Sequence, residues 1–463
     1  MNEELLPPDH LTTMDKSGKR IYLYPAAVTG IYRSRKTIVH SCLVLFFLIL
    51  PWIHVHGNQL LLLDVAQREF FVFGLHFRAH DTPLLLFLIL IFTFGIALIT
   101  ALWGRLWCGW ACPQTVFIEG IFRRIEVWVE GNHRHRSDLD KGPWTSKKIV
   151  KKSLKYFLFT LVALVITHSF LAYFVGSYEI IAMMKRPPEQ NWTSFLVILF
   201  TTAVVIFDFG WFKEQFCTIM CPYGRFQSVL MDSHSLVVAY DEKRGEPRRT
   251  WPASPTQGDC VSCQRCVQVC PTGIDIRHGI QMECIACTAC IDACDEVMIK
   301  NDKPRGLIRY TTLRELRGQV RQLLRPRTIV YSALLVVALI GMTFALGTKD
   351  FLDLVIFRAK DIPYQVLDGG TKVINHFQAE VSNQTGKEIH LFLTLAPEDQ
   401  ARGVEFIFPF NGIGVKDSDL RRLQFFVKFP KTVLQKGSTV IHLESSGSGT
   451  KKKLEVTLVG PDA

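Results

Sequence analysis

The sequence predicts a multidomain membrane protein in which spanning helices carry a cysteine-rich domain and a β-domain. Three observations predict this class. Hydrophobic residues make up 48% of the 463 residues. Five apolar runs are each close to the roughly 20 residues that a helix needs to cross a bilayer. Most of the 13 cysteines fall within one short segment. Core helices of soluble proteins are seldom so long and apolar, so the runs favour membrane spans.

Five predicted spans organise the chain. They are Thr37–His56, Thr82–Trp103, Leu154–Val175, Thr193–Phe212 and Thr328–Leu346. The predicted parts are a polar tail over 1–36, a four-helix membrane region over 37–212, a linker with the cysteine-rich domain over 213–327, a fifth helix over 328–346 and a last domain over 347–463. The first apolar run begins too late and is too long for a cleavable signal peptide.

Basic residues predict the orientation. Lys and Arg are concentrated in the tail and between the second and third spans, whereas the segments after the first and third spans hold few of them. By the positive-inside rule the amino terminus and the cysteine-rich domain are cytoplasmic, and the last domain is periplasmic, in a bacterial inner membrane. This topology accounts for the net charge of +11. We therefore expect lipid, and no nucleic acid, as a partner.

The cysteine-rich segment contains the ligand run of bacterial ferredoxins twice. It reads Cys260-x-x-Cys263-x-x-Cys266-x-x-x-Cys270-Pro271 and then Cys284-x-x-Cys287-x-x-Cys290-x-x-x-Cys294. A disulfide framework conflicts with a reducing compartment, and structural zinc takes Cys-x-x-Cys pairs rather than triplets. The segment is therefore a predicted bacterial-type 2[4Fe-4S] ferredoxin domain.

Ligand exchange between the two runs assigns the clusters. Three closely spaced cysteines wrap one cluster, and the fourth points away to the other. The predicted ligands of the first cluster are Cys260, Cys263, Cys266 and Cys294. Those of the second are Cys270, Cys284, Cys287 and Cys290. Asp292 and Asp295 place negative charge nearby, which is expected to lower the cluster potentials.

Four further cysteines form an internal repeat after the second and fourth spans. Both copies fit aromatic-Cys-x-x-x-Cys-Pro-x-x-x-Phe, with Cys108, Cys112, Cys217 and Cys221. Residues four apart share a helix face, so each copy is expected to offer two sulfurs to one site, and the following proline stops or kinks the helix. Such thiolates can hold a soft metal such as Cu(I), or cycle between dithiol and disulfide. A single copy would indicate packing, as we expect for Cys42, but the repetition favours a functional site.

Several polar residues lie in or beside the predicted spans: His54, His56, His76, His80, His168 and Asp208. The first four belong to the outer side, where imidazoles can bind copper or haem or hydrogen-bond a quinone, although solvated histidines are commoner there. The last two lie within spans, where an ionisable group is either functional or satisfied by a neighbouring helix.

The sequence of the last part of the chain predicts β-strands. Short runs rich in β-branched and aromatic residues occur over 372–381, 388–395, 424–429, 439–443 and 454–459, with a turn at 383–386. They predict a small immunoglobulin-like β-sandwich that serves as a docking or structural module. Before the fifth span, the basic segment 305–327 is expected to be helical.

The duplicated Cys-x-x-x-Cys-Pro motif, the ferredoxin block with its Pro-Thr-Gly-Ile-Asp-Ile-Arg connector and the β-domain together resemble the FixG/CcoG family of cytochrome c oxidase accessory proteins. The resemblance implies reduction of Cu(II) to Cu(I) for the cbb-type oxidase, with electrons leaving through the clusters and Cys108, Cys112, Cys217 and Cys221 as the catalytic cysteines. It implies oxidase assembly components, a copper source and a cytoplasmic electron donor of unknown identity as partners.

Two other interpretations stay open. The membrane subunits NapH and NosR share the paired motif and the ferredoxin block, so the chain can instead be a quinol-linked electron conduit that uses the outer histidines. A third interpretation is a membrane redox sensor whose clusters report oxygen through the outer domain.

Overall fold

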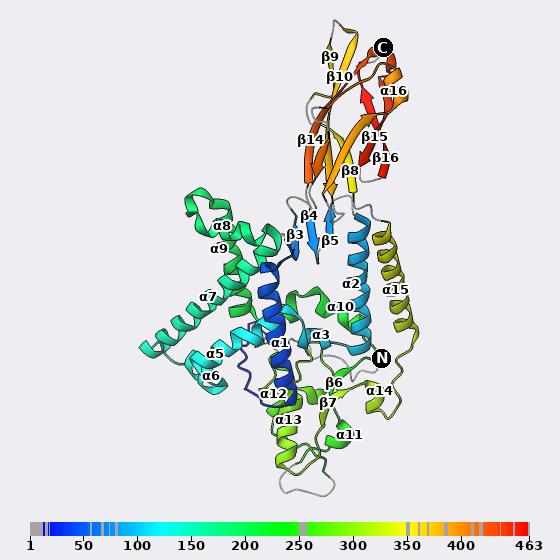
Figure 1. The fold of residues 1–463 in the computed structure, drawn as a ribbon. Coiled ribbons are helices and arrows are strands. Elements are labelled where there is room, and N and C mark those ends of the chain that lie inside the picture. The colour runs from blue at the N-terminus through cyan, green and yellow to red at the C-terminus, as the bar shows by residue number, and fades with distance from the viewer. Residues whose placement is uncertain are drawn as a thin grey trace. The chain divides into compact units, whose positions relative to one another are not determined.

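The computed structural model describes residues 13, 17, 19–55, 58–65, 69–73, 75–78, 82–249, 257–348, 352–359, 362–367, 370–383, 388–408, 412–415, 420–435, 437–447 and 450–461. The chain forms two compact units, Met1–Thr343 and Phe344–Ala463. Each has its own hydrophobic core and is described separately (Figure 1).

Five helices of the described residues are long and apolar enough to cross a membrane, which confirms the predicted number. They are α1 (Ile31–Ile49) with the 3-10 turn η2 (Leu50–Trp52), α2 (Thr82–Trp103), α7 (Ser146–Val175), α9 (Trp192–Ile206) with the π-helical turn η6 (Phe207–Phe212), and α15 (Pro326–Gly347). Their exposed faces are apolar, as a lipid surrounding requires.

Two spans begin several residues earlier than predicted, because caps rather than hydropathy decide where a helix starts. The first begins at Ile31 and the third at Ser146. The Asp292 carboxylate accepts the backbone N–H groups of Tyr32 at 3.2 Å and Arg33 at 2.7 Å, and so caps α1 from outside the helix. The polar first turns of both helices therefore extend beyond their apolar runs.

Short elements connect the spans in the first unit. Between α1 and α2 lie β1 (His54–Val55), β2 (Asn58–Gln59), and a three-stranded sheet of β3 (Leu61–Asp64), β4 (Glu69–Val72) and β5 (Leu75–Arg78). Between α2 and α7 lie α3 (Leu106–Trp110), α4 (Pro113–Phe117), the π-helical η4 (Ile118–Phe122), α5 (Arg123–Glu130) and α6 (His133–Lys141). Around α9 lie α8 (Ser177–Lys185), η5 (Pro188–Gln190), the π-helical η7 (Phe216–Met220) and α10 (Pro222–Leu230).

The cysteine-rich segment folds around a two-stranded sheet. Its elements are β6 (Val237–Tyr240), α11 (Glu242–Gly245), α12 (Arg265–Gln268), η8 (Ile276–His278), α13 (Ala289–Lys300) and β7 (Ile308–Thr311). Strand β6 pairs with β7 in antiparallel register, with Val237 opposite Thr311. Apolar side chains from the sheet and from α13 pack around the cysteines.

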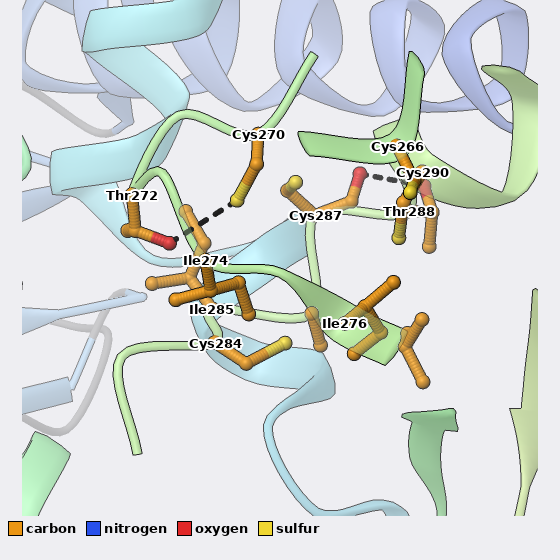
Figure 2. Close-up of a pocket in the computed structure, with 12 residues that line it drawn as sticks. Cys266, Cys270, Thr272, Ile274, Ile276, Cys284, Ile285, Cys287, Thr288 and Cys290 are labelled. Atoms are coloured by element: carbon orange, nitrogen blue, oxygen red, sulfur yellow. Dashed lines mark hydrogen bonds between the residues drawn. The ribbon is translucent and has the colours of Figure 1, made fainter. Parts of the chain in front are cut away.

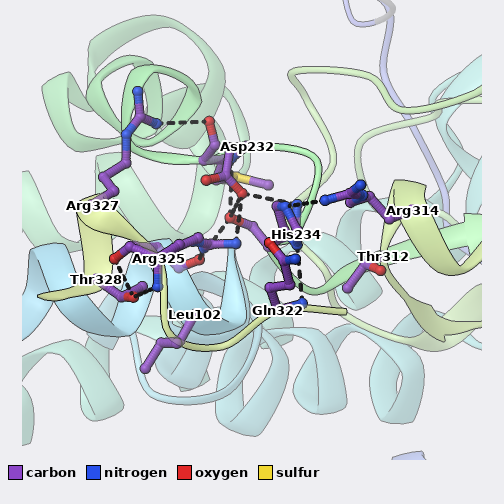
Figure 3. Close-up of polar contacts among 12 residues, drawn as sticks. Leu102, Asp232, His234, Thr312, Arg314, Gln322, Arg325, Arg327 and Thr328 are labelled. Carbon is purple, nitrogen blue, oxygen red and sulfur yellow. Dashed lines mark hydrogen bonds and ion pairs between the residues drawn. The ribbon is translucent and has the colours of Figure 1, made fainter. Parts of the chain in front are cut away.

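The segment 305–327 is not the helix that its composition predicts. It contains β7 and the short α14 (Leu313–Leu316), followed by an irregular stretch. Two of its arginines contact the turn after α10 (Figure 3): Arg325 pairs with Asp232 at 2.9 Å, and an Arg314 guanidinium nitrogen lies 2.9 Å from His234 Nε2. These long-range contacts replace the helical hydrogen bonds that local propensity favours.

The second unit is a two-sheet β-domain, as predicted. One antiparallel sheet has the order β12-β14-β10-β8, with β9 beside β10. The other has the order β13-β11-β15-β16. The bounds are β8 (Leu352–Arg358), β9 (Gln365–Leu367), β10 (Lys372–Asn383), β11 (Ile389–Leu395), α16 (Pro397–Ala401), β12 (Glu405–Ile407), β13 (Ile413–Val415), β14 (Leu420–Pro430), η10 (Lys431–Val433), β15 (Ser438–Gly447) and β16 (Thr450–Val459).

Alternate side chains of the β-domain strands fill its core. On β14, for example, Leu423, Phe425, Val427 and Phe429 are buried, as the two-residue period of a strand requires. The five predicted strands are all present, and β8, β9, β12 and β13 add to them. Most of the predicted turn, residues 384–386, lies outside the described residues.

Candidate functional site

The two cysteine loops share one unusual backbone conformation. The residues on either side of each middle cysteine have positive φ: Ser262 (53°), Gln264 (57°), Ala286 (51°) and Thr288 (65°). For a residue with a Cβ, this left-handed conformation costs about 1–2 kcal/mol. Successive amides in such turns form a concavity that binds anions. Strain repeated at matched positions therefore fits two loops built around the sulfides of iron–sulfur clusters.

The eight cysteines line two cavities. Cys270, Cys284, Cys287 and Cys290 line the first, together with Cys266 (Figure 2). Cys260, Cys263, Cys266 and Cys294 line the second. These are the same two sets of four that ligand exchange predicts, and Cys266 borders both cavities, so the cavities are neighbours. Soft sulfur donors, apolar walls and the anion-binding loop conformation fit a [4Fe-4S] group. The ligation itself stays a prediction.

Burial shapes the chemistry of these thiols. Desolvation raises the pKa of Cys287 to about 12 and that of Cys294 to about 12. A metal ligand must be a thiolate, which in an apolar pocket is stabilised by a bound cation. A bound [4Fe-4S] cluster supplies one-electron transfer, and the chain's own residues exclude water and position it.

One cysteine loop contacts the helices that leave the membrane. A Cβ on Gly109, in the first Cys-x-x-x-Cys-Pro motif, would lie only 2.4 Å from the carbonyl oxygen of Ala286. Arg105 donates to the carbonyl oxygen of Cys284 at 2.9 Å, and Lys36 donates to that of Cys287 at 3.3 Å. We therefore call Cys270, Cys284, Cys287 and Cys290 the proximal set, and Cys260, Cys263, Cys266 and Cys294 the distal set.

Aromatic side chains surround this contact. The Trp110 indole N–H donates to the Tyr310 hydroxyl at 3.0 Å, and that hydroxyl donates to the Ala286 carbonyl at 3.3 Å. The Tyr32 ring packs edge-on against both rings, with centroids 6.5 Å from Trp110 and 5.8 Å from Tyr310. Together they hold the motif against the proximal loop and limit the access of water.

Neither Cys-x-x-x-Cys-Pro motif is a continuous helix, contrary to the expected shared helical face. Helix α3 ends at Trp110, and Cys112 is extended, with φ −62° and ψ 126°. Cys221 is likewise extended, with φ −68° and ψ 110°. The physical reason is the following proline, which disfavours helix in the preceding residue and then begins a new helix, α4 or α10.

Three of the motif cysteines, Cys108, Cys112 and Cys217, nevertheless have raised pKa values to which other motif cysteines contribute. Burial and then Cys112 raise the pKa of Cys108 to about 12. Burial also raises the pKa of Cys217, and Cys112 and Cys108 raise it further. Burial raises the pKa of Cys112 as well, with a smaller contribution from Cys221. Within the described residues, however, no three His, Cys, Asp or Glu side chains are placed to hold a single metal ion. The motif cysteines thus lie near one another but do not form a complete metal-binding site in the described residues, and their role stays a prediction.

Sequence reasoning missed Gln227, which lies on α10 after the second motif. Its side chain is fully buried. The Gln227 amide donates to Cys108 Sγ at 3.2 Å, and the Cys108 thiol faces the Gln227 carbonyl oxygen at 3.4 Å. This contact joins the two repeats and orients Cys108. Its only sequence signal is its place six residues after Cys221.

Among the four outer histidines, only His54 has its side chain within the described residues. His54 lies in β1, with Nδ1 3.1 Å from the Trp52 carbonyl oxygen and Nε2 3.1 Å from Ser177 Oγ. A carbonyl only accepts, so Nδ1 donates and Nε2 accepts from the hydroxyl. Both ring nitrogens are therefore engaged within the protein. His56 and His80, and the side chain of His76, lie outside the described residues.

Other predicted polar residues have local partners. His168 Nδ1 is 2.7 Å from the Leu164 carbonyl oxygen, and Asp208 accepts from Gln114 at 2.9 Å. These contacts satisfy both groups without a ligand. Cys42 is exposed rather than packed in the core, contrary to expectation.

The acidic residues near the clusters make backbone contacts. Asp292 caps α1, and Asp295 accepts from the backbone N–H of Gly306 at 2.8 Å. Their predicted effect on the cluster potentials stays a prediction.

Family models match three regions of the chain. A "4Fe-4S dicluster domain" matches residues 212–313, a "4Fe-4S binding domain" matches residues 85–134, and the "IG-like fold at C-terminal of FixG" matches residues 342–461. The second region contains the first Cys-x-x-x-Cys-Pro motif, including Cys108 and Cys112.

Known proteins show the same likeness over most of the chain. Protein RdxB of Cereibacter sphaeroides is 34% identical over 387 residues, which cover 80% of each chain. Nitrogen fixation protein FixG of Rhizobium meliloti is 32% identical over 464 residues, covering 89% of this chain and 87% of FixG. The crystal structure of a FixG-related protein from Vibrio parahaemolyticus covers 24% of this chain and 97% of its own, with 15% identity and a TM-score of 0.19.

Spanning helices in contact with a 4Fe-4S ferredoxin domain define a multi-pass membrane iron–sulfur electron-transfer protein. With relatives above 30% identity over most of their length, the chain belongs to the FixG family, which confirms the resemblance seen in the sequence.

Proposed function

We propose that the chain reduces Cu(II) to Cu(I) during assembly of the cbb-type cytochrome c oxidase, as the family resemblance implies. The proposed route holds two [4Fe-4S] clusters, one in each cysteine set. The distal set would hold the cluster that takes one electron from a cytoplasmic donor protein, and the proximal set would hold the cluster next to the membrane. The motif cysteines would bind the substrate Cu(II), which becomes Cu(I) by accepting that one electron.

The observation that carries this proposal is the contact between Gly109 and Ala286. It puts the backbone next to Cys108 against the loop of the proximal set, with no intervening side chain. Arg105 reinforces the junction, because it also donates to the Gly224 carbonyl oxygen of the second repeat at 3.4 Å. Both repeats and the ferredoxin loop therefore meet at one guanidinium, which supports direct electron transfer between them.

The open arrangement of the motif cysteines suits copper as a substrate. Thiolates are soft ligands that favour Cu(I). A substrate ion has to arrive, accept an electron and leave, so a pair of cysteines serves it better than a closed cage. The Gln227 contact would orient Cys108 for this task.

The proposal includes the predicted orientation in a bacterial inner membrane. The amino terminus and the ferredoxin domain face the cytoplasm, where a donor can reach the exposed Cys263 of the distal set. The β-domain faces the periplasm, where it would dock oxidase assembly components or a copper source.

The test is a single-turnover assay. Protein purified anaerobically in detergent is reduced with dithionite, freed of dithionite and mixed with Cu(II), and Cu(I) is measured with a chromogenic chelator. We expect Cys108→Ala combined with Cys217→Ala to slow Cu(I) formation at least about tenfold, about 1.4 kcal/mol in barrier, with unchanged cluster EPR signals. Cys42→Ala, at an exposed cysteine, is the matched control. Equal rates in both variants would remove the motif cysteines from the mechanism.

The quinol-linked conduit predicts a different result. It requires that a reduced quinol alone reduces the clusters, as seen in their EPR spectra. Both ring nitrogens of His54 already have hydrogen-bond partners within the protein, which counts against His54 as a quinol-binding residue. Cluster reduction by quinol would nevertheless favour the conduit over the copper reductase.

A further inference from the structure

The charges beside the proximal set are unbalanced. Lys36 has only 2% of its side chain exposed, and its Nζ lies 2.9 Å from a Glu119 carboxylate oxygen. Arg33 pairs with the same oxygen at 3.1 Å. Lys36 also donates to the carbonyl oxygen of the proximal ligand Cys287 at 3.3 Å. Two cations therefore share one carboxylate next to a predicted cluster ligand.

Arg105 adds a further cation to the same loop. Its guanidinium donates to the carbonyl oxygens of Cys284, at 2.9 Å, and of Met282. Its hydrogen bonds in the described residues all go to carbonyls, so none of them neutralises it. The neighbouring Glu283 is buried and supplies the opposing carboxylate.

Reduction adds one electron to a cluster, so a nearby cation stabilises the reduced state. The effect is large where both charges are shielded from water. Basic residues at the inner end of a span are usually explained by membrane orientation. Lys36, however, is buried against the ferredoxin loop instead of reaching the lipid headgroups.

We propose that Lys36 and Arg105 tune the reduction potential of the proximal cluster, raising it so that the electron rests on the membrane side of the ferredoxin domain. This inference rests on the two-cluster assignment of the proposed function. It does not depend on copper being the acceptor.

The test is an EPR-monitored redox titration of the full, cluster-loaded chain in detergent. Lys36→Met should lower one of the two midpoint potentials and leave the other unchanged. Lys36→Arg, which keeps the positive charge, should return the shifted potential to the value of the unsubstituted protein. Glu119→Gln removes the opposing charge and should raise the same midpoint. A general loosening of the fold would not produce shifts of opposite sign.

Lys300→Met is the matched control, because Lys300 is exposed on α13 and paired with Glu296 at 2.6 Å. It should move neither midpoint. If Lys36→Met fails to retain its clusters, Arg105→Met carries the same expectation at a half-buried position. Unchanged midpoints, or equal shifts of both, would overturn the inference. A single cluster with about four irons in the unsubstituted protein would instead overturn the two-cluster assignment.

Discussion

At the scale of single residues, Gly109 decides how closely the first motif approaches the proximal loop. An alanine Cβ there would lie 2.4 Å from the Ala286 carbonyl and 2.9 Å from that of Ile285, both rigid backbone atoms. We expect Gly109→Ala to push the two backbones apart and to slow electron transfer from the reduced clusters to Cu(II) about tenfold, or about 1.4 kcal/mol.

The measurement is stopped-flow reoxidation of the clusters by Cu(II). Gly95→Ala is the matched control, because a Cβ at Gly95 meets nothing within 4 Å. Equal rates for the two variants would show that the close approach is not needed. Iron content should stay the same in both.

The residues of the candidate site differ in how far the sequence could predict them. The cysteines could be predicted because their spacing is local. The extended conformation of Cys112 could also have been predicted from Pro113. Gln227, Arg105 and Lys36 could not, because their partners lie more than about 80 residues away along the chain, as between Gln227 and Cys108 (119 residues).

At the scale of elements, α1 depends on α13 for its start. Gly30 precedes the helix and has no side chain to cap it, so Asp292 supplies both carboxylate oxygens. The close fit requires glycine, because a Cβ at Gly30 would lie 2.3 Å from the Asp292 carboxyl carbon. We expect Asp292→Ala to destabilise the first unit by about 1–2 kcal/mol through loss of this charged cap.

Thermal unfolding followed by circular dichroism in detergent checks this prediction. Asp138→Ala, at an exposed position on α6, serves as the control. A melting temperature for Asp292→Ala equal to that of the control would contradict the capping role.

Helix α1 also explains why the number of membrane spans was easier to predict than their boundaries. An apolar run is visible in the sequence itself, whereas the cap of α1 comes from a residue more than 250 positions away. The segment 305–327 failed as a predicted helix for a related reason. Its arginines are held by partners such as Asp232, which local propensity does not include.

At the scale of the whole molecule, the predicted orientation is open to a direct test. We expect alkaline phosphatase fused after residue 463 to be active, and green fluorescent protein fused before residue 1 to fluoresce, because the positive-inside rule predicts that the two ends are on opposite sides of the membrane. Fusing each reporter to the other end gives the control. The reverse pattern would place the ferredoxin domain outside and remove any cytoplasmic donor from the mechanism.

The cap on α1 also bears on how the protein is made. The ribosome completes Asp292 some 259 residues after Arg33, which at bacterial speeds is a delay of roughly 13 to 52 seconds. During that time the first span has emerged without its cap and without the loop that buries Lys36. Because Asp292 lies between the predicted ligands Cys290 and Cys294, we expect iron–sulfur insertion and completion of the membrane bundle to be linked steps of biogenesis. In iron-starved cells the newly made chain should remain a loosely held substrate for membrane proteases.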